Sequence, residues 1–123
     1  MTAPIALFVY NRPEHTKKTI EALQKNDLAN ESNLYIFSDA AKHQEATVQV
    51  QAVREYIASI NGFKSVTIIN RNFNLGLADS IVDGVTKLCN SDGKAIILED
   101  DIVTSKGFLR FMNNALNLYA DDE

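Results

Sequence analysis

The sequence predicts an α/β fold of the Rossmann-like, three-layer α/β/α type, with a mostly parallel sheet. Two observations predict it. Four short apolar segments, at residues 5–10, 34–37, 66–69 and 95–98, have the length and composition of buried strands. Each segment is followed by a polar turn and then by an amphipathic helical pattern. Such strict alternation is typical of parallel strands that are joined by helical crossovers, with helices on both faces.

Apolar positions three or four residues apart predict the four helices. The first helix runs from 13 to about 26 with Thr16, Ile20 and Leu23 on one face, and the second runs from about 44 to 60 with Val53, Tyr56, Ile57 and Ile60. The third contains Leu77, Ile81, Val85, Leu88 and Cys89, and the fourth contains Phe108, Met112, Ala115 and Tyr119. Local signals agree with these assignments, because Pro13 suits a first helical turn, Asn61-Gly62 a helix end and Ser105 an N-cap.

Length and composition indicate one compact domain, residues 1–123, with a real core: 123 residues, of which 46% are hydrophobic and 23% charged. The net charge of −4 argues against a nucleic-acid partner, since such proteins usually carry clustered Lys and Arg. Any bound phosphate must therefore be held by local groups or by a metal ion.

The single cysteine, Cys89, excludes an intramolecular disulfide, and we expect its side chain to be small, apolar and buried. No apolar run approaches membrane-spanning length, and the N-terminus lacks the pattern of a signal peptide. We therefore expect a soluble, cytoplasmic protein without a membrane span.

Polar side chains gather where the predicted strands end, at residues 11–12, 38–39, 70–76 and 99–101. In open α/β sheets, ligands bind beyond the carboxyl ends of the strands. This coincidence predicts a binding site at that edge of the sheet.

The acidic run Glu99-Asp100-Asp101 directly follows a buried strand, where three carboxylates repel one another unless a positive group joins them. In extended backbone, Glu99 and Asp101 point to one side and Asp100 to the other. Carboxylate oxygens are ligands that Mg²⁺ and Mn²⁺ prefer, so the run is a candidate cation site. The alternative is a solvated acidic turn before the last helix.

Three further residues are candidates for ligand contact. Arg12 lies at a strand-to-helix turn and can bind a phosphate or stack on a base, unless it is simply an exposed residue at a helix start. Asp39 can accept a hydrogen bond from uracil or ribose, or it only initiates a turn. Arg71 can reach a phosphate or pair with a surface acid.

Other common sites are disfavoured. His15 and His43 lack the spacing of zinc ligands and are expected at the surface. The chain contains neither a G-x-G-x-x-G nor a Walker A sequence, which disfavours dinucleotide cofactors and ATP-driven chemistry.

Three stretches resemble GT-A-fold glycosyltransferases. Residues 8–14, Phe-Val-Tyr-Asn-Arg-Pro-Glu, are similar to the opening strand and turn of that fold. Residues 97–102, Ile-Leu-Glu-Asp-Asp-Ile, resemble the DXD region in the Glu-Asp-Asp form of the N-acetylglucosaminyltransferase I type. Residues 72–77 are similar to the Asn-x-Gly loop of the family 2 enzymes.

The resemblance implies the nucleotide-binding part of a GT-A-fold enzyme. Such an enzyme transfers a sugar from a nucleotide-diphosphate donor, with UDP as the expected carrier, to an acceptor hydroxyl with Mn²⁺ or Mg²⁺. Asp101 would be the metal ligand. The nucleotide-sugar site would comprise Tyr10, Asn11, Arg12, Asp39, Arg71, Glu99 and Asp100. The acceptor, whether glycan, protein or lipid, and the catalytic base are not identified by these residues.

Domains of this type usually continue for about another hundred residues past the acidic motif. We therefore expect a domain truncated at its C-terminus, with doubtful transferase activity on its own. A truncated sheet exposes an apolar edge, which predicts self-association into homo-oligomers. The alternative function is a non-catalytic nucleotide-binding or interaction module. A receiver-like domain is disfavoured, because residues 10–12 lack the acidic pair that this class carries after its first strand.

Overall fold

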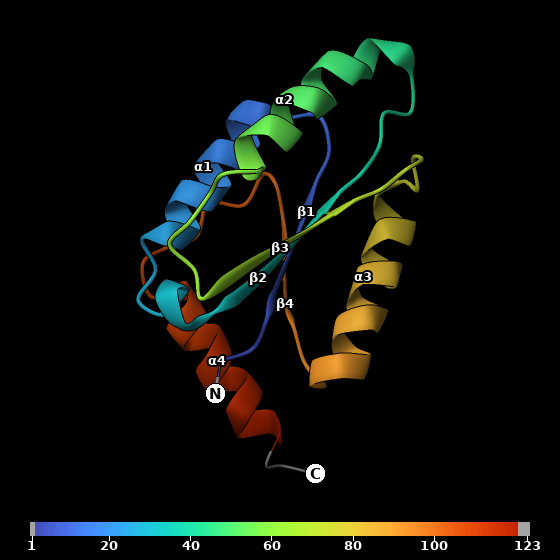
Figure 1. Cartoon of the computed structure of the whole chain (residues 1–123). Helices are drawn as coiled ribbons and strands as arrows, with labels where there is room; N and C mark the ends of the chain where they lie inside the picture. The colour runs from blue at the N-terminus through green and yellow to red at the C-terminus, as the bar shows by residue number, and fades with distance from the viewer. Residues whose placement is uncertain (1, 121–123) are drawn as a thin grey trace.

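The computed structural model describes residues 2–120 and has the predicted three-layer α/β/α architecture (Figure 1). Its sheet contains four parallel strands, β1 (Ile5–Val9), β2 (Asn33–Ser38), β3 (Ser65–Asn70) and β4 (Ile96–Glu99), in the order β3-β2-β1-β4. The fold is therefore Rossmann-like. The four strands lie within a residue or so of the predicted segments.

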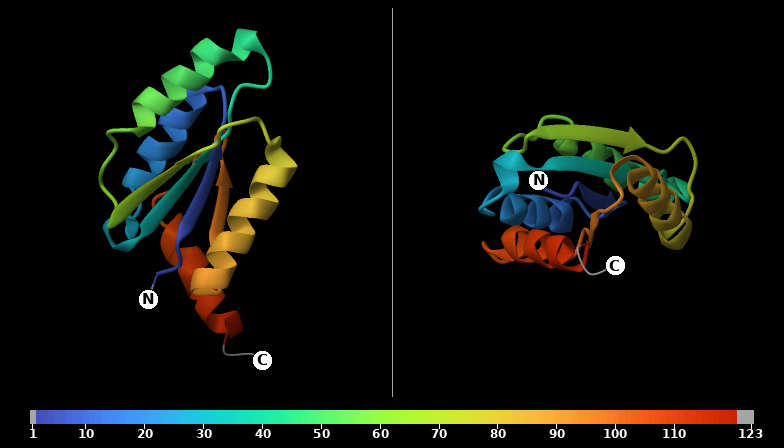
Figure 2. Two further views of the ribbon diagram at one scale, coloured as in Figure 1. Left: turned by 45° about the vertical axis from the view of Figure 1, so that its right-hand side comes forward. Right: turned by 90° about the horizontal axis from the view of Figure 1, so that it is seen from below.

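Four helices flank the sheet: α1 (Pro13–Gln24), α2 (Thr47–Ile57), α3 (Leu77–Asp92) and α4 (Phe108–Ala120). Two short 3₁₀ turns, η1 (Ala29–Glu31) and η2 (Gln44–Ala46), precede β2 and α2. Helices α1, α2 and α4 cover one face of the sheet, while α3 alone covers the other (Figure 2). No helix of residues 2–120 is both long enough and apolar enough to cross a membrane.

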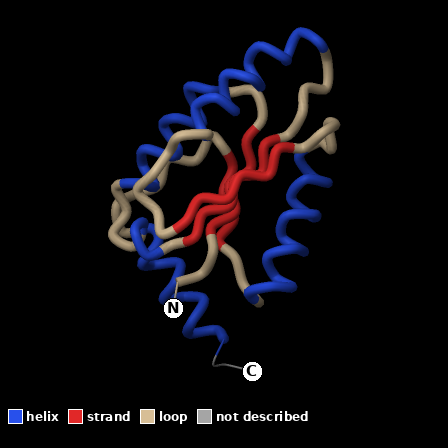
Figure 3. The backbone as a smooth tube through the Cα atoms, in the orientation of Figure 1, coloured by secondary structure: helices blue, strands red, loops and turns tan. Residues whose placement is uncertain are grey.

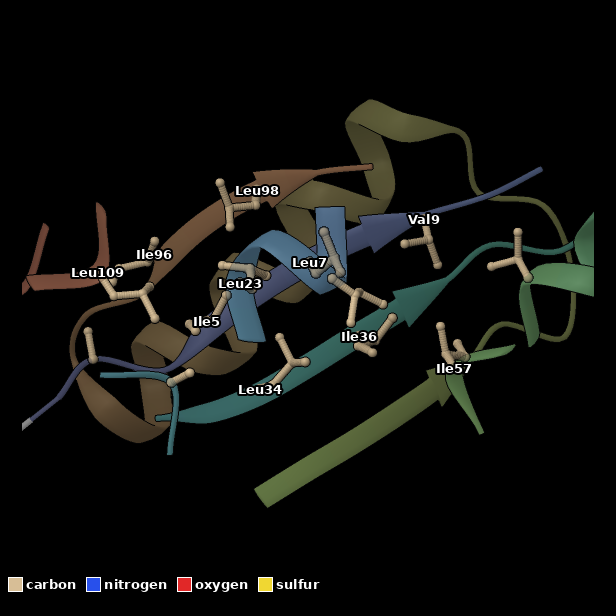
Figure 4. Packing of buried hydrophobic residues seen from close by; sticks show 14 residues of the cluster. Ile5, Leu7, Val9, Leu23, Leu34, Ile36, Ile57, Ile96, Leu98 and Leu109 are labelled. Atoms are coloured by element: carbon tan, nitrogen blue, oxygen red, sulfur yellow. The ribbon is translucent and has the colours of Figure 1, made fainter. Parts of the chain in front are cut away.

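Strand β1 lies at the centre of the molecule, and all five of its residues are buried. Because successive side chains of a strand point to opposite faces, β1 contributes to two cores. The larger core joins Ile5 and Leu7 to Leu34 and Ile36 of β2 and to helices α1, α2 and α4 (Figure 4). The smaller core lies under α3 and includes Phe8.

The smaller core is built around two stacked aromatic rings. Phe8 of β1 and Phe37 of β2 are aligned partners in the sheet, and their ring centroids lie 5.0 Å apart. Helix α3 packs against both rings through Gly84, where a built Cβ would lie only 2.8 Å from Phe8 Cζ. The absence of a side chain at this position lets α3 approach the sheet.

Two helix predictions require correction. The second helix ends at Ile57, three residues before the predicted end, and Asn61-Gly62 lies in the following loop, where Gly62 has a φ of +94°. In α3 the buried positions are Ser80, Gly84 and Leu88, whereas Leu77 and Cys89 are exposed. The prediction of a buried Cys89 was wrong because Ser80, Gly84 and Leu88 share the buried face of α3, and Cys89, one position after Leu88, lies about 100° away from that face.

The first turn of α4 is capped by a residue distant in sequence. Asn26 Oδ1 accepts a hydrogen bond from Leu109 N at 2.9 Å, and Asn26 Nδ2 donates to Thr104 Oγ1. The prediction of Ser105 as the N-cap was wrong, because α4 begins at Phe108 and Ser105 contributes only its backbone carbonyl, which accepts from Phe108 N. The side chain of Tyr119, a predicted apolar position of this helix, lies outside the described side chains.

Strand β4 lies at an edge of the sheet, because within residues 2–120 it pairs only with β1. Ile97 of β4 is 43% exposed, on the face that α3 alone covers. The prediction of a buried fourth strand therefore holds for Ile96 and Leu98 only. The prediction of a buried third strand was wrong, because β3 lies at the other edge of the sheet and its residues are exposed or only partly buried. His15 and His43 are exposed, as predicted.

Candidate functional site at the ends of β1 and β4

A pocket of about 300 Å³ lies beyond the carboxyl ends of β1 and β4. From β1 the chain continues to β2 and β3 on one side, and then crosses back to β4 on the other side of β1. Such a reversal of strand order leaves a crevice where ligands of doubly wound sheets bind. Figure 3 shows the carboxyl ends of the strands passing into loops at the upper end of the sheet.

The pocket brings together seven of the eight residues predicted for the site: Tyr10, Asn11, Arg12, Asp39, Glu99, Asp100 and Asp101. These residues come from the ends of three strands, which are far apart in the chain but adjacent in the sheet. The eighth residue, Arg71, does not line this pocket. Sequence reasoning missed Lys42 and Ser80, and it named Asn74, Gly76 and Leu77 only as members of the segments 70–76 and 72–77.

The acidic residues form a turn rather than an extended strand end. Strand β4 stops at Glu99, and Ile102 N donates to Glu99 O at 3.3 Å, so Asp100 and Asp101 lie within a turn. The prediction of alternating side-chain directions therefore does not extend past Glu99. Thr19 Oγ1 donates to Asp100 O at 2.8 Å and ties this turn to α1.

Asp100 is partly buried and lies near charged groups of both signs. Burial raises the pKa of Asp100, and the neighbouring carboxylates of Asp101 and Glu99 raise it further. The positive charges of Arg12 and His15 act in the opposite direction. Because the net effect raises the pKa, the ionised form of Asp100 is destabilised, and a bound cation would relieve this destabilisation.

The acidic turn offers two accessible carboxylates, and the described residues do not complete a cation site around them. Among residues 2–120, no three His, Cys, Asp or Glu side chains are grouped as a metal-binding cluster. Mg²⁺ commonly binds one or two carboxylates and completes its shell with water and substrate phosphates. Exposed Asp101 and partly exposed Glu99 are available as such ligands.

Tyr10 and Arg12 form the wall of the pocket that follows β1. The Tyr10 hydroxyl accepts a hydrogen bond from Lys42 N at 2.9 Å, which holds the tyrosine against the loop after β2. Arg12 is the N-cap residue of α1, and its side chain is exposed. Pro13 at the first helical position lacks an N–H, so this helix start offers fewer donors to an anion than an ordinary one.

Asp39 lies directly after β2 and is only 6% exposed. Its carboxylate accepts hydrogen bonds from the backbone N–H groups of Ala40, Leu75 and Gly76 and from the side-chain amide of Asn74. These contacts join the end of β2 to the loop before α3. The turn-forming alternative for Asp39 is thus present in the structure.

Arg71 is a buried structural residue. Its guanidinium donates to Asp83 Oδ2 at 2.6 Å and to the carbonyl and hydroxyl of Ser80, and it lies over the ring of Phe37 at 5.1 Å from the centroid. These contacts hold α3 on the sheet and leave the guanidinium 9% exposed. The surface acid that was the alternative partner in the sequence is Asp83.

Arg54 of α2 is a further residue that the sequence did not single out. Its guanidinium donates to the Ser38 hydroxyl and carbonyl, both at 3.1 Å, and to the Arg71 carbonyl at 2.9 Å. It therefore joins the carboxyl ends of β2 and β3 directly behind the pocket wall. An arginine in an amphipathic helix carries no local signal of this role, because its partners lie on other elements.

The ion pair of Arg71 predicts a pH-dependent stability. Hydrogen bonds from Lys87 and Arg71 lower the pKa of Asp83. The stability that the pair contributes is therefore present above the ordinary carboxyl pKa of about 3.9 and is lost as the pH falls through the lower, folded-state pKa. Asp83→Asn should lower the urea midpoint at neutral pH, and the difference from wild type should disappear in acid. A difference that is equal at both pH values would contradict this assignment.

Comparison with known proteins does not extend the assignment, since the chain matches no family model and no curated protein.

Proposed function

We propose that this chain is the donor-binding domain of a glycosyltransferase, and that its pocket binds a nucleotide-diphosphate sugar together with Mg²⁺ or Mn²⁺. The observation that supports the proposal is the convergence at one pocket of Arg12 and the acidic turn, at the reversal of strand order. The local resemblance of the β1 and β4 ends to GT-A glycosyltransferases favours a sugar nucleotide, with UDP as the preferred carrier, over other phosphorylated ligands.

Two positive charges would bind the donor: a cation held by the acidic turn, and the guanidinium of Arg12. Asp101 would ligate the cation, with Glu99 beside it, and the cation would in turn hold the diphosphate oxygens. Arg12 is exposed at the rim and can donate to a phosphate or stack on the base. A cation that neutralises the acidic turn lets an anionic donor bind a protein of net charge −4.

The chemistry of sugar transfer would require groups beyond donor binding. A bound cation supplies charge stabilisation for a departing diphosphate. The acceptor hydroxyl also needs a base. Asp39 is saturated with hydrogen bonds, Asp101 and Glu99 would ligate the proposed cation, and Asp100 lies in the same turn. We therefore assign these residues to binding and orienting the donor, and no residue to the base.

Titration calorimetry of UDP with and without Mn²⁺ tests the proposal. We expect UDP to bind more tightly with Mn²⁺, and Mn²⁺ to bind more tightly with UDP by the same factor, because the two affinities are thermodynamically linked. Asp101→Asn should weaken UDP binding in Mn²⁺ by roughly 30-fold or more, which corresponds to about 2 kcal/mol for the loss of one charge at such a contact.

Asp92→Asn provides the matched control, since Asp92 is exposed at the far end of α3 and makes the same change of charge. Its affinity for UDP should equal that of wild type. UDP binding that is independent of Mn²⁺ would instead favour a nucleotide-binding module without transferase chemistry. Absence of UDP binding at any metal concentration would refute the proposal.

A further inference from the structure

We infer that Asp39 is a positioning residue, whose carboxylate shapes the pocket wall and does not contact the ligand. This inference rests on the proposed function only in so far as the pocket binds a nucleotide. It concerns the loop that connects β3 to α3, residues 71–76, which packs against the end of β2 through Asp39. The hydrogen bonds of the carboxylate carry the argument.

Both oxygens of Asp39 are fully used. Oδ1 accepts from Ala40 N and Leu75 N, both at 2.9 Å, and Oδ2 accepts from Gly76 N at 3.0 Å and Asn74 Nδ2 at 3.2 Å. A carboxylate has about four lone-pair sites, so four donors leave none for a ribose hydroxyl or a base N–H. A ligand group could bind Asp39 only by displacing one of these donors.

The donors belong to the segment that begins α3. Gly76 is the N-cap residue of this helix and has a φ of +82°, in a region that favours glycine, and its carbonyl accepts from Ser80 N at 3.0 Å. Asp39 thus holds the backbone on one side of Gly76 while the helix begins on the other. Leu77 and Ser80, in the first turn of the helix, line the pocket. The carboxylate therefore sets where this wall stands.

Positioning and direct contact predict different responses to ligand identity. Uracil presents an N–H donor at N3, whereas cytosine presents an acceptor there, so a carboxylate that contacted this atom would favour UDP over CDP. A carboxylate that only positions the wall affects both nucleotides equally. A contact with the ribose would do the same, because both nucleotides share it, but the four donors that already occupy Asp39 leave no acceptor site for that contact. Asp39→Asn preserves the shape of the side chain, but it turns an NH₂ group toward N–H donors and removes about half of the hydrogen bonds.

The first measurement needs no ligand. Amide hydrogen exchange is followed at Leu75 and Gly76 in wild type, in Asp39→Asn and in Asp92→Asn, the exposed control with the same chemical change. We expect exchange at Leu75 and Gly76 to accelerate at least about tenfold in Asp39→Asn, because a hydrogen bond to a charged acceptor is lost, and to stay unchanged in the control. Unchanged exchange in Asp39→Asn would overturn the inference.

The second measurement compares UDP with CDP in the presence of Mn²⁺. Asp39→Asn should weaken both by the same factor, whereas a loss confined to UDP would overturn the inference. If Asp39→Asn does not fold, Asn74→Ala removes one donor to Asp39 together with the hydrogen bond to Ala40 O at 2.8 Å. Faster exchange at Gly76 with an unaltered ratio of UDP to CDP affinity is then expected. The exchange result stands even if wild type binds no nucleotide, so failure of the proposed function is distinguishable from failure of this inference.

Discussion

Replacing Gly84 with leucine is expected to destabilise the protein by more than about 3 kcal/mol. Even a bare Cβ at this position would lie 2.8 Å and 2.9 Å from two atoms of the Phe8 ring and 3.1 Å from Phe37. Both rings are almost fully buried and stacked on each other, so neither can retreat without disturbing the sheet. Added methylenes in a packed core usually cost about 1–3 kcal/mol, and leucine adds several.

Chemical denaturation of three variants measures this effect. Gly84→Ala should lie between wild type and Gly84→Leu, because its gain of about 1 kcal/mol in helix propensity partly offsets the clash. Gly107→Ala is the control, since nothing lies within 4 Å of a Cβ built there. Its free energy of unfolding should stay within about 0.5 kcal/mol of wild type. A Gly84→Leu variant as stable as the control would show that α3 does not pack on the rings in this way.

Arg71→Ala is expected to cost about 2–4 kcal/mol of stability. The substitution removes the hydrogen bonds to Asp83 and Ser80 and leaves a cavity over the ring of Phe37. It also detaches α3 from the end of β3, because Arg71 is the first residue after that strand. We expect the loss to appear in thermal and urea unfolding alike.

Arg110→Ala makes the same chemical change at the surface. Arg110 is exposed and lies 3.8 Å from Asp27 in a loose ion pair, and such pairs contribute about 0–1 kcal/mol. The two variants should therefore differ clearly in the urea midpoint. Equal midpoints would mean that the Arg71 guanidinium is solvated and free, as a direct phosphate ligand would be before it binds.

The fold was predictable because its strongest signals are local. The five residues of β1 form an apolar run, which a strand requires when it is covered on both faces, and all five are buried. The buried face of α1 contains Thr16, Ile20 and Leu23, as its periodicity predicts. The prediction for α3 was less accurate, because close approach to the stacked rings favours Ser80 and Gly84 over larger apolar residues.

The part of the candidate site that lies at the strand ends was predictable from the sequence. In a parallel sheet, carboxyl ends share one edge, so polar residues after β1, β2 and β4 converge whatever the loops between them do. The loop before α3 obeys no such rule. Arg71 in that loop turns toward the sheet and Asn74 toward the pocket, although they are only three residues apart. Their directions depend on Asp83 and Asp39, which the local sequence does not specify.

The spacing of apolar residues and the composition of the segments therefore determined the parallel sheet, the order of its elements along the chain and the edge at which polar groups gather. The tertiary structure decided which of those groups remain free to meet a ligand. Asp39 and Arg71 both lie at strand ends, yet buried hydrogen bonds already hold each of them. The physical reason is that a buried charged group must find partners within the fold, and those partners come from segments that only folding brings together.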